Sequence, residues 1–367
     1  MAETFQITNV LEGIREAVSF GKKKIVGIDI GSSAIKVAEV SVQGRGKVRL
    51  HRFAHIPLPE GAIIEDEIIK GDEISTAIED AIKEASCVGH AVCFGMAGQH
   101  SITKKIQVAG GSKDEVDDQV YWEIEQFIPF DIDDSAISYD VIGENNAGGV
   151  DVVFCAAKSD AVDNYKNLFE QANIKVKIVD TNIASLINVF EYNYQDKVKN
   201  SDRSYIILDF GAQRTEFIVY REGTLSFCKE MNIGGLVITE EIQRKMGVKY
   251  ESAEDLKIVG DSSGNLPEEV LSIIDDVVEV FLVEAKKTLD FYIQSTSDET
   301  IDHIYVTGGS GQIPGFIEGL ASALGHEVSI FNPLENIDYD KHFSTEEINY
   351  IGHCGAVALG LAMRSGD

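Results

Sequence analysis

The chain is short of positive charge. Its 367 residues include 32 lysines and arginines against 61 aspartates and glutamates, which gives a formal net charge of −29. A surface this acidic repels nucleic acid and anionic lipid headgroups at long range, and it favours solubility. This balance excludes a nucleic-acid function.

Long apolar runs are missing as well. No run approaches the ~18 residues that span a bilayer. The N-terminus lacks the basic-then-apolar order of a signal peptide, so we expect a cytoplasmic protein. At 367 residues, 44% hydrophobic and 25% charged, the chain is long enough for two globular domains with full cores.

Cysteine is scarce and scattered, and no two cysteines form a C-x-x-C pair. A zinc site needs clustered ligands, so the cysteines do not indicate one. We expect all of them to be reduced core residues. They are Cys87, Cys93, Cys155, Cys228 and Cys354.

Two segments, a domain's length apart, share one pattern. The first reads Ile25-Val-Gly-Ile-Asp29-Ile-Gly31 and the second Tyr205-Ile-Ile-Leu-Asp209-Phe-Gly211, each followed by small or polar residues and a second apolar run. The pattern predicts two β-hairpins with Asp-x-Gly at the turn. Glycine lets an anion approach the backbone N–H groups, and the aspartate suits a hydrated Mg²⁺. Two such hairpins facing each other would clamp the phosphates of a nucleotide.

A single Asp-x-Gly between strands is more often an ordinary turn. Here the motif occurs twice, with strands on both sides each time. The repetition therefore indicates a duplicated fold with one shared cleft.

Periodicity divides the chain. Residues 1–21 carry Val10, Leu11, Ile14 and Val18 at helical spacing, which indicates either an amphipathic helix that docks on a membrane or partner, or a mobile leader. We expect a first α/β domain over 22–200, a second over 201–345, and a small-residue helix in 346–367 that returns to the first domain.

The first domain contains an insert at about 102–178. Its pattern predicts a β-α-β-β-α-β unit, with an edge-like strand at Ile102–Val108. The insert is either a structural subdomain or an interaction module, and the aromatic segment Gln126–Phe130 favours interaction. In the second domain, a long helix over about 268–295 has its apolar positions at Val270, Ile273, Ile274, Val277, Val280, Phe281, Val283 and Leu289.

Three further segments fit a nucleotide clamp. Ile304–Phe316 reads as a strand, a glycine turn and a helix. Glu254 and Lys257 are three apart at a helix start, so they share one face, either to hydrogen-bond a ribose or simply as a solvated ion pair. Tyr350–Leu361 reads as one small-residue helix that packs closely.

In this order, these segments resemble the actin-like ATPase superfamily, with an actin-like/ribonuclease H-like two-domain fold. The insert in the first domain is similar to the SHS2-like subdomain of the FtsA branch. Within that branch, Gly27-Ile-Asp-Ile-Gly-Ser-Ser with Lys36, the helix Val120–Pro129 running into Phe130, and Ser138–Ile142 resemble the PilM family of type IV pilus assembly. The resemblance spans about residues 22–364.

The resemblance implies ATP or ADP with Mg²⁺, and Asp29 and Asp209 near the metal. It implies a cytoplasmic protein, peripheral to the inner membrane through partners, that docks the N-terminal cytoplasmic peptide of the inner-membrane protein PilN between the insert and the domain core. It also implies indirect links to pilus motor ATPases, and leaves self-association open. The implied cofactor-binding residues are Asp29, Gly31, Ser32, Ser33, Lys36, Asp209, Gly211, Ala212, Gly234, Gly235, Glu254, Lys257, Gly308, Gly309 and Ser310.

The chain departs from the superfamily pattern at Arg214, where small or hydroxyl residues are more usual, which leaves open how tightly the second turn holds phosphate. No residue stands out to orient a water for hydrolysis. We therefore expect weak turnover, with the nucleotide acting mainly as a conformational ligand. The competing hypotheses are an FtsA-like membrane-tethered division or secretion scaffold and, further off, a sugar or acid kinase.

Overall fold

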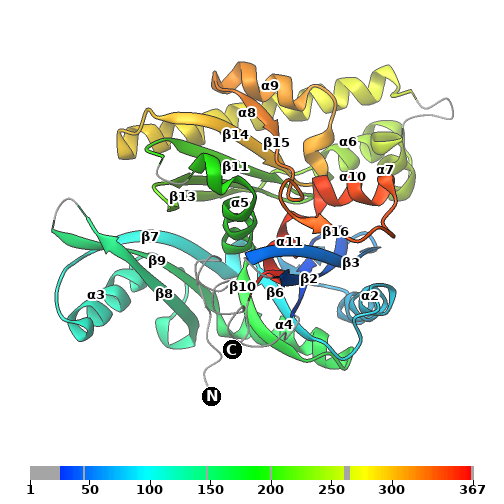
Figure 1. The fold of residues 1–367 in the computed structure, drawn as a ribbon. Coiled ribbons are helices and arrows are strands. Elements are labelled where there is room, and N and C mark those ends of the chain that lie inside the picture. The colour runs from blue at the N-terminus through cyan, green and yellow to red at the C-terminus, as the bar shows by residue number, and fades with distance from the viewer. Residues whose placement is uncertain (1–24, 44–45, 146–147, 199–200, 260–264, 365–367) are drawn as a thin grey trace. The chain divides into compact units, whose positions relative to one another are not determined.

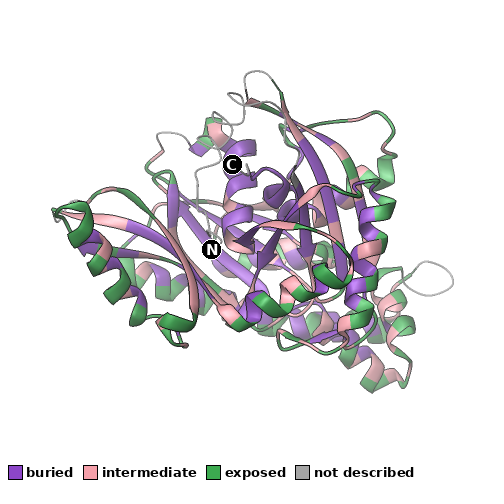
Figure 2. Ribbon diagram, turned by 90° about the horizontal axis from the view of Figure 1, so that it is seen from below, coloured by how far each residue is buried: buried purple, intermediate pink, exposed green. Residues whose placement is uncertain are grey.

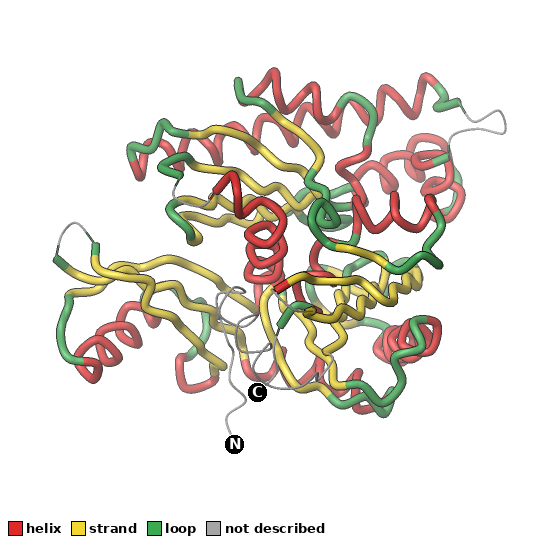
Figure 3. Tube along the Cα trace, in the orientation of Figure 1, coloured by secondary structure: helices red, strands yellow, loops and turns green. Residues whose placement is uncertain are grey.

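The computed structural model describes residues 25–43, 46–145, 148–198, 201–259 and 265–364. It divides into two compact units. The first comprises Met1–Ser201, Gly223–Phe227 and Pro333–Asp367, and the second comprises Asp202–Glu222 and Cys228–Asn332. Strands and helices alternate within each unit (Figures 1 and 3). The helix predicted within residues 1–21 lies outside the described residues.

The first unit is built on a six-stranded sheet of order β10-β6-β1-β2-β3-β16. β1, β2 and β3 form an antiparallel meander, while β6 and β10 add in parallel on the other side of β1. The predicted first hairpin is confirmed. The strands are β1 (Ile25–Ile30), β2 (Ala34–Gln43), β3 (Lys47–Pro57), β6 (Ala91–Met96), β10 (Val176–Thr181) and β16 (Asp338–Tyr339), and a small hairpin pairs β4 (Ile63–Ile64) with β5 (Glu67–Ile68).

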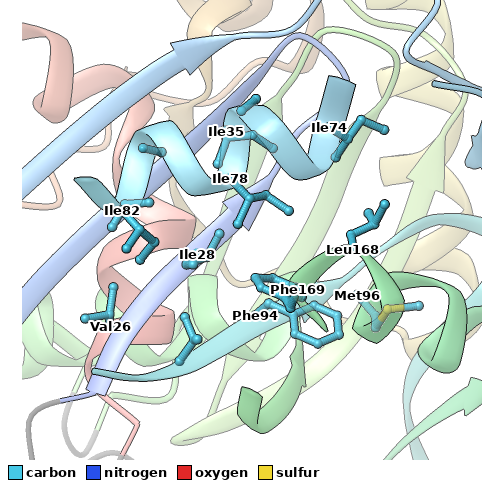
Figure 4. Packing of buried hydrophobic residues seen from close by; sticks show 14 of the residues in the cluster. Val26, Ile28, Ile35, Ile74, Ile78, Ile82, Phe94, Met96, Leu168 and Phe169 are labelled. Carbon is cyan, nitrogen blue, oxygen red and sulfur yellow. The ribbon is translucent and has the colours of Figure 1, made fainter. Parts of the chain in front are cut away.

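One face of this sheet packs against α2 (Gly71–Glu84) and α4 (Ser159–Gln171). Alternate β1 residues Val26 and Ile28 point to this face and are fully buried with Ile78. Figure 4 shows α2 and α4 contributing to the same cluster, with Phe94 and Phe169 in contact at its centre. Each fully buried isoleucine contributes about 2 kcal/mol of apolar transfer free energy.

The opposite face of β1 carries the small-residue contacts. A methyl group at Gly27 would lie 2.2 Å from the Ala358 carbonyl oxygen of α11 (Ala356–Ala362), and one at Gly360 would lie 2.0 Å from the Ser185 carbonyl oxygen of α5 (Asn182–Val198). The predicted close packing is thus confirmed. The predicted single helix is wrong, because the chain breaks at Gly355 between α10 (Thr345–Cys354) and α11.

A three-stranded antiparallel sheet of order β7-β9-β8 forms the insert, and α3 covers one of its faces (Figure 1). The predicted edge position of β7 is confirmed. The predicted β-α-β-β-α-β unit over 102–178 is wrong in its second half, because β10 pairs with β6 and α4 fills the main core. The elements are η2 (Gly98–His100), β7 (Ser101–Ala109), α3 (Lys113–Glu125), η3 (Ile132–Asp134), β8 (Ser135–Glu144) and β9 (Gly149–Lys158).

The second unit repeats the strand order of the first. Its sheet runs β13-β12-β11-β14-β15, so a hairpin at the centre is again extended by two parallel strands. The predicted second hairpin is therefore confirmed. The elements are β11 (Ser204–Phe210), β12 (Thr215–Arg221), β13 (Thr224–Met231), α6 (Leu236–Met246), α7 (Tyr250–Ile258), α8 (Glu268–Thr296), β14 (Ile301–Thr307), η4 (Gly309–Gln312), α9 (Phe316–Leu324) and β15 (Val328–Ile330).

Burial follows the predicted pattern with exceptions. Figure 2 colours the buried residues purple and the solvent side of the helices green. On α8, six of the predicted apolar positions are buried, but Val280 and Val283 are 61% and 49% exposed. Cys228 and Cys354 are half-buried rather than core residues, while the other three cysteines are buried. Within the described ranges, no helix has the length and apolar character to cross a membrane.

Candidate functional site

The turn of the first hairpin joins β1 to β2. Asp29 ends the buried part of β1 and is 5% exposed. The Gly31 amide closes the turn by donating to the Ala34 carbonyl oxygen at 3.1 Å, and the Leu58 amide donates to the Ser33 carbonyl oxygen at 2.9 Å. The predicted phosphate-loop residues therefore form one tight turn beside a buried carboxylate.

Asp29, Lys36 and His55 stand in one row across three strands. Asp29 is paired with Lys36 between β1 and β2, and Lys36 with His55 between β2 and β3. The Lys36 ammonium donates to the Asp29 carboxylate at 2.8 Å. Burial disfavours the charged lysine, but the attraction of Asp29 outweighs it and raises the pKa of Lys36.

His55, the last member of this row, is uncharged at neutral pH. Burial, together with the Lys36 charge, lowers the pKa of His55 to about 4. The His55 ring packs 4.6 Å, between centroids, from the ring of Tyr350 on α10. Burial also raises the pKa of Tyr350 above its ordinary value. Sequence reasoning missed His55 and Tyr350, although strand register could have indicated His55 once β2 and β3 were aligned.

The second hairpin turn is closed in the same way, with the Gly211 amide donating to the Arg214 carbonyl oxygen at 3.0 Å. The Arg214 guanidinium, the departure noted in the sequence, forms a salt bridge with Glu230 on β13 at 2.9 Å. An internal carboxylate therefore holds this charge within the second unit. Asp209 is the second-to-last residue of β11.

Three predicted glycines crowd against this turn. A methyl group at Gly234 would lie 2.3 Å from the Ala212 carbonyl oxygen, and one at Gly308 would lie 2.6 Å from an Asp209 carboxylate oxygen. At Gly235 it would lie 2.1 Å from the Ser310 hydroxyl. No side chain fits at these positions without displacing its neighbours. The glycine-rich segments are therefore folded directly against the turn.

Hydrogen bonds join the same segments. The Gly211 carbonyl oxygen accepts from the Gly235 amide at 3.0 Å and from the Ser310 hydroxyl at 2.9 Å. The Ala212 carbonyl oxygen accepts from the Leu236 amide at 2.8 Å. The loop after β14 does not enter a helix directly, since η4 intervenes before α9.

Glu254 and Lys257 belong to this cluster. The sequence had suggested a helix start, but Glu254 lies in the middle of α7 and Lys257 in its last turn. The Lys257 ammonium donates to Glu254 at 2.8 Å, to the buried Thr239 hydroxyl at 2.8 Å and to the Gly235 carbonyl oxygen at 3.3 Å. The pair is thus tied to the glycine segment rather than solvated, and Thr239 is a member that the sequence did not reveal.

The predicted site residues therefore converge in two groups, one in each unit. That Asp29 and Asp209 face one crevice stays a prediction, because they lie in different units. Among the described residues, no three His, Cys, Asp or Glu side chains gather to hold a metal ion. A hydrated Mg²⁺ that uses one or two carboxylates and phosphate oxygens needs no such cluster.

The duplicated sheet with its paired hairpins and small-residue helix contacts defines an actin-like ATPase fold. Residues 27–366 match the family model described as type IV pilus assembly protein PilM. The chain belongs to that family, as its motifs predicted.

Known structures and sequences agree with this assignment. The chain is similar to a structure of the PilM–PilN type IV pilus biogenesis complex, with a TM-score of 0.82 and 26% identity, over 94% of this chain and 99% of that one. It is 24% identical to the cell division protein FtsA of Rhizobium meliloti over 51% of this chain, and 22% identical to FtsA of Pseudomonas aeruginosa over 64%. The matches span only 46% and 60% of those two proteins.

Proposed function

We propose that this chain is an ATP-binding scaffold of type IV pilus assembly, which holds Mg–ATP or Mg–ADP and docks the cytoplasmic tail of a PilN-like inner-membrane protein. The observation that carries the nucleotide part is the convergence in the second unit. Three segments that are far apart in sequence, the turn after Asp209, Gly234–Leu236 and Gly308–Ser310, meet through backbone and glycine contacts that leave no room for side chains. Such a cradle suits a ligand that binds backbone groups.

The residues present fit a magnesium nucleotide. Asp29 and Asp209 would hold the hydrated metal, which would neutralise phosphate charge. The amides of the Gly31–Ser33 turn and of Gly211 and Ala212 would hold phosphate oxygens, with Lys36 as their cation. Glu254 and Lys257 would bind the ribose hydroxyls, and Gly308–Ser310 would lie against the adenosine.

The partner part rests on the family and on the matched complex. The structure of that complex contains PilN, and the similarity covers nearly the whole of the matched chain. Docking on a PilN-like peptide would place this chain at the cytoplasmic side of the inner membrane and link it indirectly to the motor ATPases. We expect turnover to be weak, with the nucleotide favouring one arrangement of the two units.

Calorimetry with Mg–ATP tests the nucleotide site. Asp29→Asn and Asp209→Asn should each weaken binding at least tenfold, whereas Asp302→Asn, which removes an exposed carboxylate from β14, should leave it unchanged. Equal affinities for all of these variants and the parent would refute the site. Circular dichroism on each variant separates loss of binding from loss of fold.

The partner is tested with a synthetic peptide from the N-terminus of a PilN-like protein. Replacing residues 101–158 by a short linker removes β7 to β9 and keeps α4, whose Leu168 and Phe169 fill the main core. The variant should lose the peptide and keep Mg–ATP. If the peptide still binds with parental affinity, the insert is not its docking surface.

A further inference from the structure

The helix α3 of the insert presents the only tryptophan of the chain to solvent. Trp122 is 62% exposed. The other side of α3 is committed to the insert's own core, because Val116, Val120 and Ile124 are buried against the sheet. Two positions after Val120, Trp122 lies on the far side of the helix. A large aromatic side chain held on the outer face of a well-packed helix is typical of an interaction surface.

Carboxylates frame this tryptophan. α3 carries six acidic residues and one lysine along its 13 positions. Asp118 and Glu125 are both exposed, and they lie four before and three after Trp122, so the three side chains form one stripe. We name Asp118, Trp122 and Glu125 the α3 face.

The end of α3 departs from the usual placement of helix charges. Its last turn contains Glu123 and Glu125 and no basic residue. Carboxylates there face the negative end of the helix dipole, which is unfavourable. A cation bound at this end would reverse that cost. Local choices that oppose stability in this way are expected at functional surfaces.

The insert already contains one cation–π contact. Phe127, just past the end of α3, is covered by the Lys104 ammonium at 3.6 Å from the ring centroid. In the part of the chain that the structure describes, no such cation covers Trp122. Tryptophan is the ring that binds cations best.

We propose that the α3 face docks a basic segment of a partner protein. One arginine or lysine of that segment would stack on Trp122, and adjacent basic residues of the segment would pair with Asp118 and Glu125. Charge selects this occupant. A nucleic acid or an anionic membrane is repelled by the face, and so is a second copy of this chain, which carries the same acidic helix and a net charge of −29. The docking requires neither the nucleotide nor the PilN-like peptide.

A cationic probe tests the proposal. The probe is a fluorescein-labelled peptide of four Arg-Leu-Ala-Lys repeats, whose affinity is measured by anisotropy at physiological ionic strength. The emission of Trp122, the sole tryptophan, reports occupancy of the face in the same titration. The parent should bind with a shift in this emission. Asp118→Asn/Glu125→Gln and Trp122→Ala should each weaken binding at least tenfold, and Trp122→Phe should retain most of it.

The matched control is Asp275→Asn/Glu279→Gln, which removes two exposed carboxylates from α8. Its net charge equals that of the Asp118→Asn/Glu125→Gln variant. It should weaken binding less than twofold. If the control weakens binding as much as the α3 variant, or if the peptide binds without any change in tryptophan emission, the proposal is overturned. The Mg–ATP affinity of the same variants should stay at the parental value, which keeps this outcome separate from the proposed nucleotide function.

Discussion

Gly308 offers the sharpest test of the nucleotide contacts proposed for the second unit. Its φ is 91°, a conformation that favours glycine. A methyl group there would lie 2.4 Å from the Phe210 carbonyl oxygen and 2.6 Å from an Asp209 carboxylate oxygen, about 1 Å inside van der Waals contact. In Gly308→Ala, either the loop after β14 or the end of β11 must therefore move by about 1 Å, and the Asp209 carboxylate with it.

We expect two effects of different size. Backbone strain and the displaced strand end should lower the free energy of unfolding by about 2–4 kcal/mol. The shift of Asp209 should weaken Mg–ATP binding by at least tenfold in protein that is still folded, since a displacement of about 1 Å at such a site is costly. Urea denaturation measures the first effect, and calorimetry well below the unfolding midpoint measures the second.

Gly315→Ala is the matched control. Gly315 follows on the same connection and also has a positive φ of 77°, but a methyl group there meets no atom within 4 Å. It should cost only the strain of the left-handed conformation, about 1 kcal/mol, and leave nucleotide affinity unchanged. If Gly308→Ala binds Mg–ATP as tightly as Gly315→Ala, the assignment of this loop to the site is wrong.

Two further predictions concern the frame of the site. Asp298 is 2% exposed, and although burial raises its pKa, hydroxyl donors that include Ser204 and Thr300 outweigh this and lower it to about 2. This carboxylate therefore stabilises the fold above pH ~4, and about 2 kcal/mol should be lost as the pH falls from ~4 to ~2. Urea titrations should show that loss in the parent and not in Asp298→Asn. Gly360→Ala places a methyl group 2.0 Å from the Ser185 carbonyl oxygen, so α5 and α11 must separate; thermal unfolding should reveal a loss of about 1–3 kcal/mol, and an unchanged midpoint would contradict the packing.

The hairpins could be predicted because their signal is local. Alternating β-branched residues around Asp-x-Gly specify two strands and a turn without reference to the rest of the chain. The glycines at 234, 235 and 308 stood in short segments whose order matched a known family. Their convergence on one turn is a matter of tertiary structure, and the contacts of Thr239 with Lys257 and Glu254 became visible only there.

Long-range choices were the part that sequence could not decide. The helix α4 and the strand β10 have clear local patterns, yet nothing local says whether β10 pairs within the insert or with β6. The apolar stripe predicted for α8 was too wide, because Val280 and Val283 lie beside that stripe but face solvent. His55 lies beside Lys36 because of the register between β2 and β3. Tyr350 packs on His55 from a helix almost 300 residues further along the chain.

The two hairpins of the duplicated fold differ in charge at one equivalent position. The cross-strand partner of Asp29 is Lys36, whereas the cross-strand partner of Asp209 is Glu216, which is 4% exposed. The first pair is neutral overall, and the second brings two carboxylates side by side, which a nearby cation would stabilise. We therefore expect Asp209 to contribute more than Asp29 to metal binding, and Lys36 to neutralise phosphate charge. Calorimetry with ATP in the presence and absence of Mg²⁺ should then show that Asp209→Asn abolishes the benefit of the metal while Asp29→Asn only reduces it, and the reverse order would contradict this division of roles.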